Sequence, residues 1–373
     1  MELIKFLKEN DNWRELLTQS PYCLSIKEKD NYAIFKYNQL ESDMSLRIVQ
    51  ESRGIIIDLN DYSIACLAFF KFYNAQEPLA AKLEGKIRAL EKIDGSIVKA
   101  WVDRSGEVRV STNGMIDASD ADILLPTDGI KTYRDLFNKA LEASGLQLDY
   151  FKKYPNYTFI FELVSPLNRI VVPYQKTELY FLGIRNNETL QEWTPYDFED
   201  DVLKTHFPYP KLYNINSVDQ AIEVAKTLGA NEEGFVLVDE NFNRVKVKSS
   251  EYLAMHLLRN NTLSQRSFLA TVLENKQDDL VAFFPEYEPF IRTIEEKIVN
   301  YINSVEKALQ MANYDLDKKD FALEVLSSEY MKKFSNILFK TYENHSYDWR
   351  GNTFNIDNIN KVMALLELNV QKK

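Results

Sequence analysis

Residues 86–101 read KIRALEKIDGSIVKAW, in which two strand-like runs flank the tetrapeptide Lys92-Ile93-Asp94-Gly95. Asp-Gly is a strong turn dipeptide, so this pattern by itself predicts a hairpin. A second interpretation is that the turn presents Lys92 at a sheet edge, where an unprotonated amine can attack a phosphorus atom. A lysine amine has an ordinary pKa of about 10.4 and is a poor nucleophile while protonated, so such a site needs nearby cations or desolvation.

Short β-rich runs continue on both sides of this segment, from about residue 30 to residue 250. Apolar and polar residues alternate in several of them, and Gly, Asn or Asp separates them. The runs cover residues 32–37, 54–58, 63–70, 96–102, 107–110, 157–162, 179–184, 234–238 and 244–248. Helical spacing appears at residues 131–149, and Ser217 is a candidate N-cap for a helix over 218–228 that Gly229 ends. The pattern predicts an α+β fold with mostly antiparallel sheets.

The last third of the chain has a helical pattern. Apolar residues recur mostly at steps of three and four within residues 287–309, 323–339 and 356–366, and these stripes are typical of a helical core. No low-complexity linker or internal repeat separates this part from the β-rich part. We therefore expect two directly packed domains, residues 1–252 with antiparallel sheets and an all-helical domain at 253–373.

Composition restricts the classes of function. Of 373 residues, 45% are hydrophobic and 27% are charged, an ordinary globular mixture. No apolar run is long enough for a membrane helix, and the N-terminal residues are too polar for a secretory signal. Two cysteines and three dispersed histidines form no zinc-type pattern. We expect a cytoplasmic protein in which oxygen atoms would hold any metal ion.

The net charge is −11, which opposes a general nucleic-acid-binding surface. It leaves room for a local cleft lined by Lys and Arg. Residues 244–248, RVKVK, place Lys246 and Lys248 on one face of a strand, where they could hold an α-phosphate or form a solvated face. Glu233 precedes an apolar strand and could be a divalent-metal ligand or a turn acid. Glu162 ends another apolar strand, where a buried carboxylate needs a donor such as a ribose hydroxyl.

Taken in order, these motifs resemble those of the covalent nucleotidyltransferase superfamily of DNA ligases, RNA ligases and mRNA capping enzymes. The motifs are KIDGS at 92–96, FE at 161–162, EG at 233–234 and KVKS at 246–249. Further segments resemble the phage T4-type RNA ligase 1 family, namely ESRG at 51–54, FKFYN at 70–74, FELVSPLNRIV at 161–171 and KVKSSEY at 246–252. The resemblance covers roughly residues 30–256.

The resemblance implies a role for each motif residue. Lys92 would be the nucleophile that carries AMP, Glu162 a ribose contact and Glu233 a metal-associated carboxylate. The other implied ATP-binding residues are Glu91, Asp94 and Gly95 beside the nucleophile, Lys246 and Lys248 at the α-phosphate, and Arg53 and Lys71 at the β- and γ-phosphates. Arg53 and Lys71 also have structural explanations, because Arg53 precedes a turn glycine and Lys71 could lie along an aromatic patch.

The implied activity is ATP-dependent joining of a 5′-phosphate and a 3′-hydroxyl RNA end, with Mg²⁺ or Mn²⁺. A cleaved tRNA is one candidate substrate, and the helical domain is a candidate for RNA recognition. No obligate protein partner and no membrane are expected, and the setting is the host cytoplasm if a phage encodes the chain. The segment STNG at 111–114 departs from the basic family pattern, because Asn113 supplies no charge. A DNA ligase or capping-type enzyme and a catalytically silent RNA-binding scaffold remain alternatives.

Overall fold

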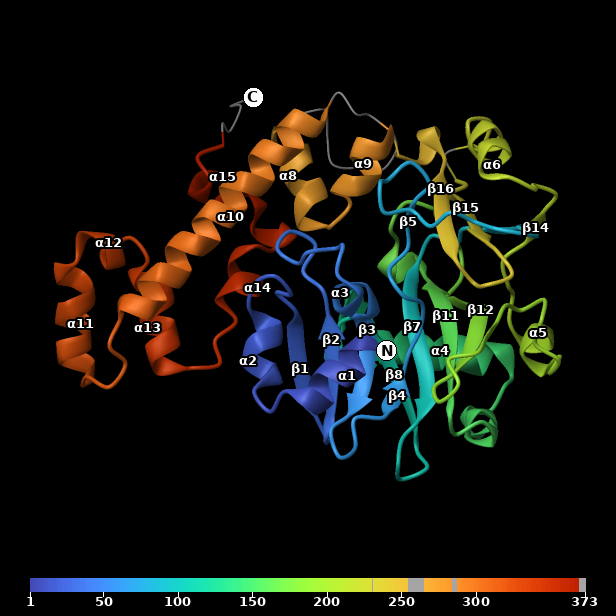
Figure 1. The fold of residues 1–373 in the computed structure, drawn as a ribbon, viewed down its shortest axis with the longest axis horizontal. Helices are drawn as coiled ribbons and strands as arrows, with labels where there is room; N and C mark the ends of the chain where they lie inside the picture. The colour runs from blue at the N-terminus through green and yellow to red at the C-terminus, as the bar shows by residue number, and fades with distance from the viewer. Residues whose placement is uncertain (230, 254–264, 284–286, 369–373) are drawn as a thin grey trace. The chain divides into compact units, whose positions relative to one another are not determined.

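The computed structural model describes residues 1–229, 231–253, 265–283 and 287–368. It divides into two compact units, Met1–His256 and Leu257–Lys373 (Figure 1). The predicted domain boundary at residue 252 stays a prediction, because residues 254–264 lie outside the described residues. The helices that the structure describes include none with the length and apolarity needed to cross a membrane.

Two five-stranded sheets form the core of the first unit. The first sheet has the order β13-β12-β11-β7-β8 and contains β7 (Ser96–Val102), β8 (Val108–Thr112), β11 (Tyr157–Val164), β12 (Glu178–Asn186) and β13 (Glu192–Trp193). The second has the order β14-β6-β15-β16-β5 and contains β5 (Tyr73–Asn74), β6 (Arg88–Glu91), β14 (Leu212–Tyr213), β15 (Gly234–Val238) and β16 (Arg244–Lys248). All strand pairs in both sheets are antiparallel except β16 with β5. This confirms the predicted fold class.

The KIDG segment links the two sheets, so the predicted hairpin is wrong. The strand before it, β6, pairs with β14 and β15, whereas β7 pairs with β8 and β11. The segment is held to both sheets, because the Lys92 amide donates to the Gly234 carbonyl at 2.9 Å and Gly95 lies tightly against β11. A Cβ at Gly95 would stand 2.5 Å from the Leu163 carbonyl oxygen. Lys92 is therefore placed at a crossover between sheets and not at a sheet edge.

A four-stranded sheet and three helices form the N-terminal part of the unit. The sheet has the order β1-β2-β3-β4, and its elements are β1 (Ser25–Lys29), β2 (Tyr32–Lys36), β3 (Arg53–Asp58), β4 (Ile64–Cys66), α1 (Glu2–Glu9), α2 (Trp13–Thr18) and α3 (Arg47–Glu51). The run predicted at 63–70 is thus a strand only over β4. Glu51 is buried and accepts a hydrogen bond from the Leu3 amide at 2.9 Å, so the ESRG segment anchors the N-terminal helix.

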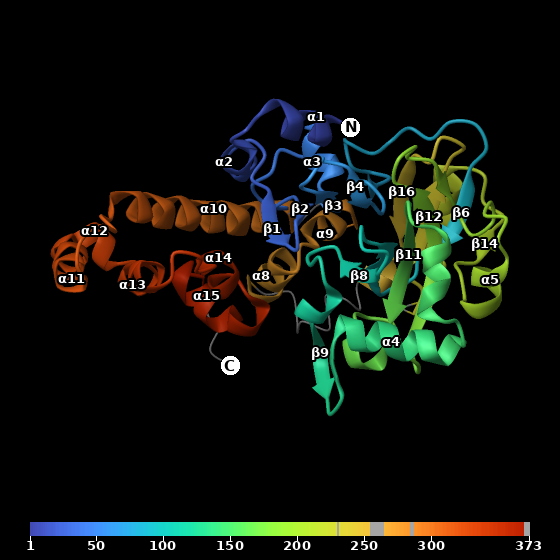
Figure 2. The ribbon, with the colours of Figure 1, turned by 90° about the horizontal axis from the view of Figure 1, so that it is seen from below.

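Further short elements complete the first unit. A hairpin consists of β9 (Asp122–Thr127) and β10 (Ile130–Thr132), and the helices are α4 (Tyr133–Ser144), α5 (Val202–His206) and α6 (Val218–Ala225). The Ser217 hydroxyl accepts from the Gln220 amide at 3.1 Å, which confirms the predicted N-cap, although α6 ends before residue 228. Helix α4 ends at Gly145 and is shorter than predicted; it packs Leu136 and Phe137 against β11 and β12 (Figure 2).

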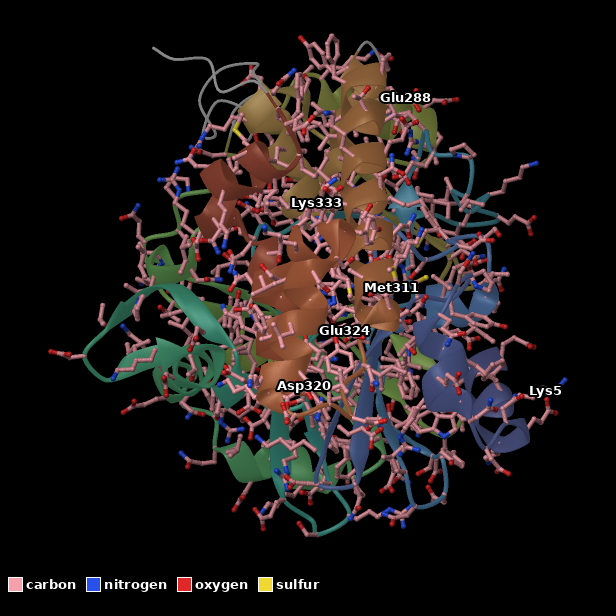
Figure 3. The ribbon with its side chains drawn as sticks, turned by 90° about the vertical axis from the view of Figure 1, so that its left-hand side faces the viewer. Lys5, Glu288, Met311, Asp320, Glu324 and Lys333 are labelled. Atoms are coloured by element: carbon pink, nitrogen blue, oxygen red, sulfur yellow. The ribbon has the colours of Figure 1, made fainter. Side chains whose placement is uncertain are left out.

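The described residues of the second unit form helices and no strand. They are α8 (Gln265–Leu273), α9 (Gln277–Phe283), α10 (Glu288–Met311), α11 (Lys318–Ser327), α12 (Glu329–Lys332), α13 (Ser335–Glu343), α14 (Trp349–Thr353) and α15 (Ile359–Leu365). Figure 3 labels Glu288 and Met311 at the two ends of α10. The stripe from Ile291 to Val305 on this helix is buried, which confirms that it is core.

The aromatic core between α4 and the first sheet allows a stability test. Phe159 is fully buried, and its ring centroid lies 4.8 Å from that of Phe151. We expect Phe159→Ala to lower the free energy of unfolding by about 3–5 kcal/mol, because it leaves a cavity in this core. Urea unfolding of the full chain measures the change. Leu124→Ala is the control, because Leu124 is 54% exposed and its loss should cost less than about 0.5 kcal/mol.

Candidate active site

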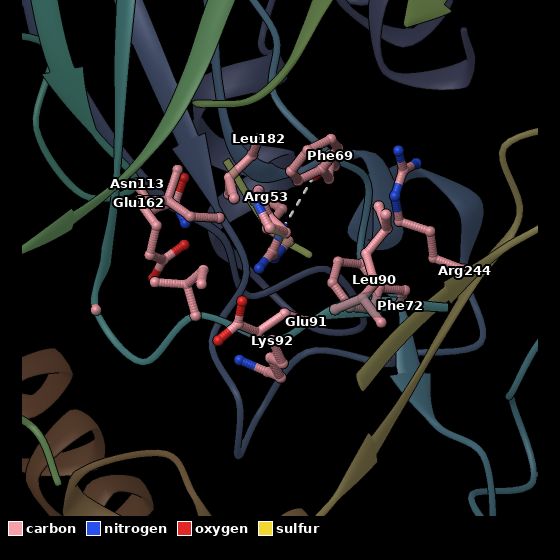
Figure 4. Close-up of a pocket in the computed structure, with 15 residues that line it drawn as sticks. Arg53, Phe69, Phe72, Leu90, Glu91, Lys92, Asn113, Glu162, Leu182 and Arg244 are labelled. Carbon is pink, nitrogen blue, oxygen red and sulfur yellow. Dashed lines mark hydrogen bonds between the residues drawn. The ribbon is translucent and has the colours of Figure 1, made fainter. Parts of the chain in front are cut away.

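A cavity of about 290 Å³ opens beside the KIDG crossover. Five of the predicted site residues line it, namely Arg53, Glu91, Lys92, Gly95 and Glu162. Figure 4 shows Arg53, Glu162 and Lys92 projecting toward the same space from three different segments. The apolar walls come from Phe69, Phe72, Leu90, Ile97, Leu182 and Val236. The combination of flat apolar walls with a few charged groups suits a nucleotide.

One buried carboxylate joins two of the predicted lysines. The two Glu233 carboxylate oxygens accept hydrogen bonds at 2.8 Å from Lys92 Nζ and at 2.9 Å from Lys248 Nζ. Burial by itself would raise the pKa of Glu233, but the two ammonium groups outweigh it and hold that pKa below its ordinary value. Glu233 is therefore ionised, and it fixes the position of the Lys92 amine.

A second group of cations surrounds Tyr37, at the end of β2. Lys71 Nζ lies 5.1 Å from the centre of the Tyr37 ring. Burial would raise the pKa of the Tyr37 hydroxyl, but the nearby charges outweigh it and lower that pKa; in decreasing order of effect they are Lys71, Arg53, Lys246 and Lys36. Three of the predicted phosphate contacts, Arg53, Lys71 and Lys246, thus act electrostatically on one hydroxyl. Sequence reasoning missed Tyr37, because one more aromatic residue at the end of an apolar run carries no distinguishing signal.

Arg53 is positioned by a close backbone contact. Gly54 has a φ of +78°, and a Cβ there would lie 2.8 Å from the backbone of Asn113. Behind this contact, the fully buried Lys99 on β7 donates to the Gly54 carbonyl at 2.5 Å. Burial lowers the pKa of Lys99, Cys66 opposes this shift and Arg53 adds to it. Lys99 carries no distinguishing signal in the sequence, because it lies in an ordinary apolar strand.

Asn113 lines the cavity at the point where the family pattern is basic. Its side-chain oxygen is buried, and no described residue donates a hydrogen bond to it. A cation from another strand lies close by, because Lys36 Nζ is 3.9 Å from where a Cβ of Gly114 would stand. Lys36, at the end of β2, is thus a cation beside this uncharged segment.

Two further predicted carboxylates, Asp94 and Glu162, differ in role. Asp94 does not line the cavity; its carboxylate accepts from the amides of Val171 and Val172 at 2.9 and 2.7 Å and from the Tyr252 hydroxyl at 2.8 Å. It ties the KIDG segment to the ends of two other motifs. Glu162 lines the cavity, and burial raises its pKa to about 8, with Lys92 opposing the shift and Glu233 adding to it. At neutral pH its carboxyl group is mainly protonated and can donate a hydrogen bond.

The raised pKa of Glu162 predicts a pH dependence of stability. The folded protein holds this proton up to about pH 8, whereas the unfolded chain releases it near the ordinary value of about 4.5. The stabilisation is therefore complete at low pH and is lost as the pH rises through 8. As the pH rises from 6 to 9, we expect the free energy of unfolding of Glu162→Gln to increase relative to that of wild type by an amount on the order of 2 kcal/mol. Urea unfolding of both proteins tests this, and parallel pH profiles would contradict it.

Comparison with known proteins identifies the family. The RNA ligase family model matches residues 51–252, more than half of the chain. A protein of Autographa californica nuclear polyhedrosis virus, named as a bifunctional polynucleotide kinase/RNA ligase, is 28% identical over 310 residues, which are 77% of this chain but 42% of that protein. The RNA ligase of Rhodothermus phage RM378 is 25% identical over 363 residues, 80% of this chain and 79% of that one. An archaeal ATP-dependent RNA ligase structure has 14% identity over 79% of this chain and 82% of its own, with a TM-score of 0.49. The chain belongs to the RNA ligase family of the phage T4 RNA ligase 1 type.

Proposed function

We propose that this chain is an ATP-dependent RNA ligase in which Lys92 carries AMP. The observation that carries the proposal is that two lysines contact one carboxylate: Lys92 Nζ lies 2.8 Å and Lys248 Nζ 2.9 Å from Glu233. Lys92 also lines a nucleotide-sized cavity. In this proposal Lys92 would attack the α-phosphate and Lys248 would contact it. Membership of the RNA ligase family supports this assignment.

The first step transfers AMP from ATP to the protein. The Lys92 amine gives up a proton to solvent and forms a nitrogen–phosphorus bond with the α-phosphate, while the bond to the bridging oxygen of the β-phosphate breaks and pyrophosphate leaves. Attack in line with the leaving group requires cations on the far side of the α-phosphate. Arg53 and Lys71 are our candidates for that side, with Lys246 and Lys248 at the α-phosphate. Charge that develops during attack is stabilised most by such preorganised cations.

Glu162 and Tyr37 add hydrogen-bonding groups to this arrangement. The protonated carboxyl group of Glu162 would donate to a ribose hydroxyl. The Tyr37 hydroxyl lies among the cations proposed to hold the phosphates, so it would donate to a phosphate oxygen of the leaving group. The backbone around Glu91 and Gly95 would border the nucleoside.

A divalent metal ion, Mg²⁺ or Mn²⁺, would accompany the phosphates of ATP. Among the described residues, no three His, Cys, Asp or Glu side chains converge to hold an ion by themselves. This fits an ion bound mainly by phosphate oxygens and water, to which Glu233 would contribute one carboxylate. When bound, the ion would neutralise charge on the phosphate oxygens.

The next steps would transfer AMP to a 5′-phosphate RNA end and then join that end to a 3′-hydroxyl with release of AMP. A cleaved tRNA is a candidate substrate, and recognition of structured RNA is a candidate role for the helical unit. Viral and phage relatives suggest the host cytoplasm as the setting. The rival DNA ligase or capping assignment would favour a β-barrel after the KxK strand, and residues 265–283 and 287–368 contain no strand.

The proposed nucleophile predicts a specific loss of activity. Lys92→Met should reduce labelling of the protein by α-³²P-labelled ATP to background, because the proposed nitrogen–phosphorus bond cannot form without the Lys92 amine. The same variant should still join an RNA that already carries a 5′-adenylate, which shows that its site is folded. Lys86→Met is the matched control, since Lys86 is exposed and lies in the same segment. Label retained on the Lys92→Met protein would contradict the assignment, and wild-type protein that takes no label would favour a silent RNA-binding scaffold.

The Tyr37 hydroxyl predicts a smaller and selective effect. We expect Tyr37→Phe to raise the KM for ATP in self-adenylylation by about 3- to 10-fold, the equivalent of one lost hydrogen bond of ordinary strength. Joining of pre-adenylated RNA should keep its wild-type rate, because no pyrophosphate leaves in that step. Equal losses in both assays would show that Tyr37 does not act through the phosphates of ATP.

A further inference from the structure

A second cavity, of about 370 Å³, adjoins the nucleotide cavity. Phe69, Phe72 and Arg244 line both of them, so only one layer of side chains separates the two. The second cavity lies between α3 and the strands β12, β13 and β16. Most of its lining residues have no role in the proposed transfer of AMP.

Positive charge is concentrated around this second cavity. Its lining includes four cationic side chains, Arg47, Lys71, Arg185 and Arg244, and a single carboxylate, Glu192. The chain as a whole carries a net charge of −11. This is a local basic cleft of the kind that an acidic protein needs in order to hold a polyanion.

Two of these arginines are buried and form ion pairs with the same carboxylate. Glu192 pairs with Arg185 through one oxygen and with Arg244 through the other, and all three side chains are less than 9% exposed. The group therefore retains one uncompensated positive charge. The Nε atom of Arg185 is also buried, and no described residue accepts a hydrogen bond from it. A buried donor without a partner is unusual and costly, and an anion would satisfy both the charge and the donor.

Aromatic rings and the guanidinium groups that lie over them give the lining flat surfaces that suit a base. The guanidinium groups of Arg47 and Arg185 lie over the Phe70 ring, at 4.6 and 4.7 Å from its centre, and that of Arg244 lies 4.3 Å from the centre of the Phe69 ring. Proteins bind single-stranded nucleic acid with this combination of stacking surfaces and phosphate-binding cations. A free inorganic anion would not require the aromatic surfaces.

We propose that this second cavity binds one phosphodiester and the adjoining base of the RNA strand that is to be sealed. The phosphate would meet Arg185 and Arg47, and the strand would then reach the nucleotide cavity across Phe69 and Phe72. The inference rests on the proposed function for the identity of the substrate. Residues of the FKFYN segment line this cavity, and the proposal adds to them Arg47, Arg185 and Glu192, which lie outside the quoted motifs.

Arg47→Gln is the decisive variant, and Arg14→Gln is its matched control. The Arg47 and Arg14 side chains are 53% and 55% exposed, each pairs with a glutamate and each lies over an aromatic ring, but only Arg47 lines the cavity. Binding of a 5′-phosphorylated single-stranded RNA is measured by fluorescence anisotropy at several salt concentrations. We expect Arg47→Gln to weaken binding about 5- to 20-fold, while Arg14→Gln binds as wild type does. In Arg47→Gln the slope of the logarithm of the binding constant against the logarithm of the salt concentration should fall by the equivalent of about one phosphate contact.

Self-adenylylation with labelled ATP separates this inference from the proposed function. Arg47→Gln should keep the wild-type KM for ATP. A raised KM for ATP with unchanged RNA binding would assign the cavity to the phosphates of ATP and overturn the proposal. Unchanged RNA binding in Arg47→Gln, or an equal loss in Arg14→Gln, would overturn it as well.

Gln191→Glu, which adds a negative charge at an exposed position of the same cavity, should weaken RNA binding without any change in the core. Absence of labelling in wild type would instead count against the proposed function.

Discussion

The site depends on one buried carboxylate that is shared between two lysines. Glu233 is 5% exposed, and its ionised form is sustained only because Lys92 and Lys248 both contact it. Removal of one lysine would leave Glu233 in a simple pair with the other, whereas removal of Glu233 would leave two like charges close together without a counterion. The carboxylate therefore selects one geometry in which two amines lie close together in spite of their repulsion. A polyphosphate can enter this arrangement as a further anion, and the cations already point toward it.

The fold brings these groups together by placing them at the meeting of two sheets. Lys92 follows β6 of one sheet, Glu162 lies on β11 of the other, and Arg53 begins β3 of a third sheet. Local contacts then set the positions, since Gly54 packs on the Asn113 backbone and Asp94 joins the KIDG segment to Val171, Val172 and Tyr252. Several motif residues thus fix the positions of neighbouring segments. Only some of the motif residues line the cavity.

The sequence predicted chemistry better than connectivity. The alternating residues 244–248 do form a strand, and Lys248 contacts Glu233, which also contacts Lys92. The sequence could predict this strand because the alternation of side chains along a strand is a local property. Turn propensity by itself predicts a hairpin at KIDG, and this prediction fails because turn propensity does not specify which strands pair. The strand β1 was missed because SIKEK has no apolar alternation, and β13 and β14, with two residues each, are too short to show a period. Tyr37 and Lys99 gain their importance only from neighbours that are distant in sequence.

The Arg185–Glu192–Arg244 group also has a mechanical consequence. Arg185 and Glu192 belong to β12 and β13 of the first sheet, whereas Arg244 belongs to β16 of the second. The group is thus a clamp across the seam along which both cavities lie. Any opening of the sheets would have to pull a carboxylate from a guanidinium in a buried setting, at a cost of several kcal/mol. The group consequently resists separation of the sheet whose strand β6 leads into Lys92 from the sheet whose strand β11 carries Glu162.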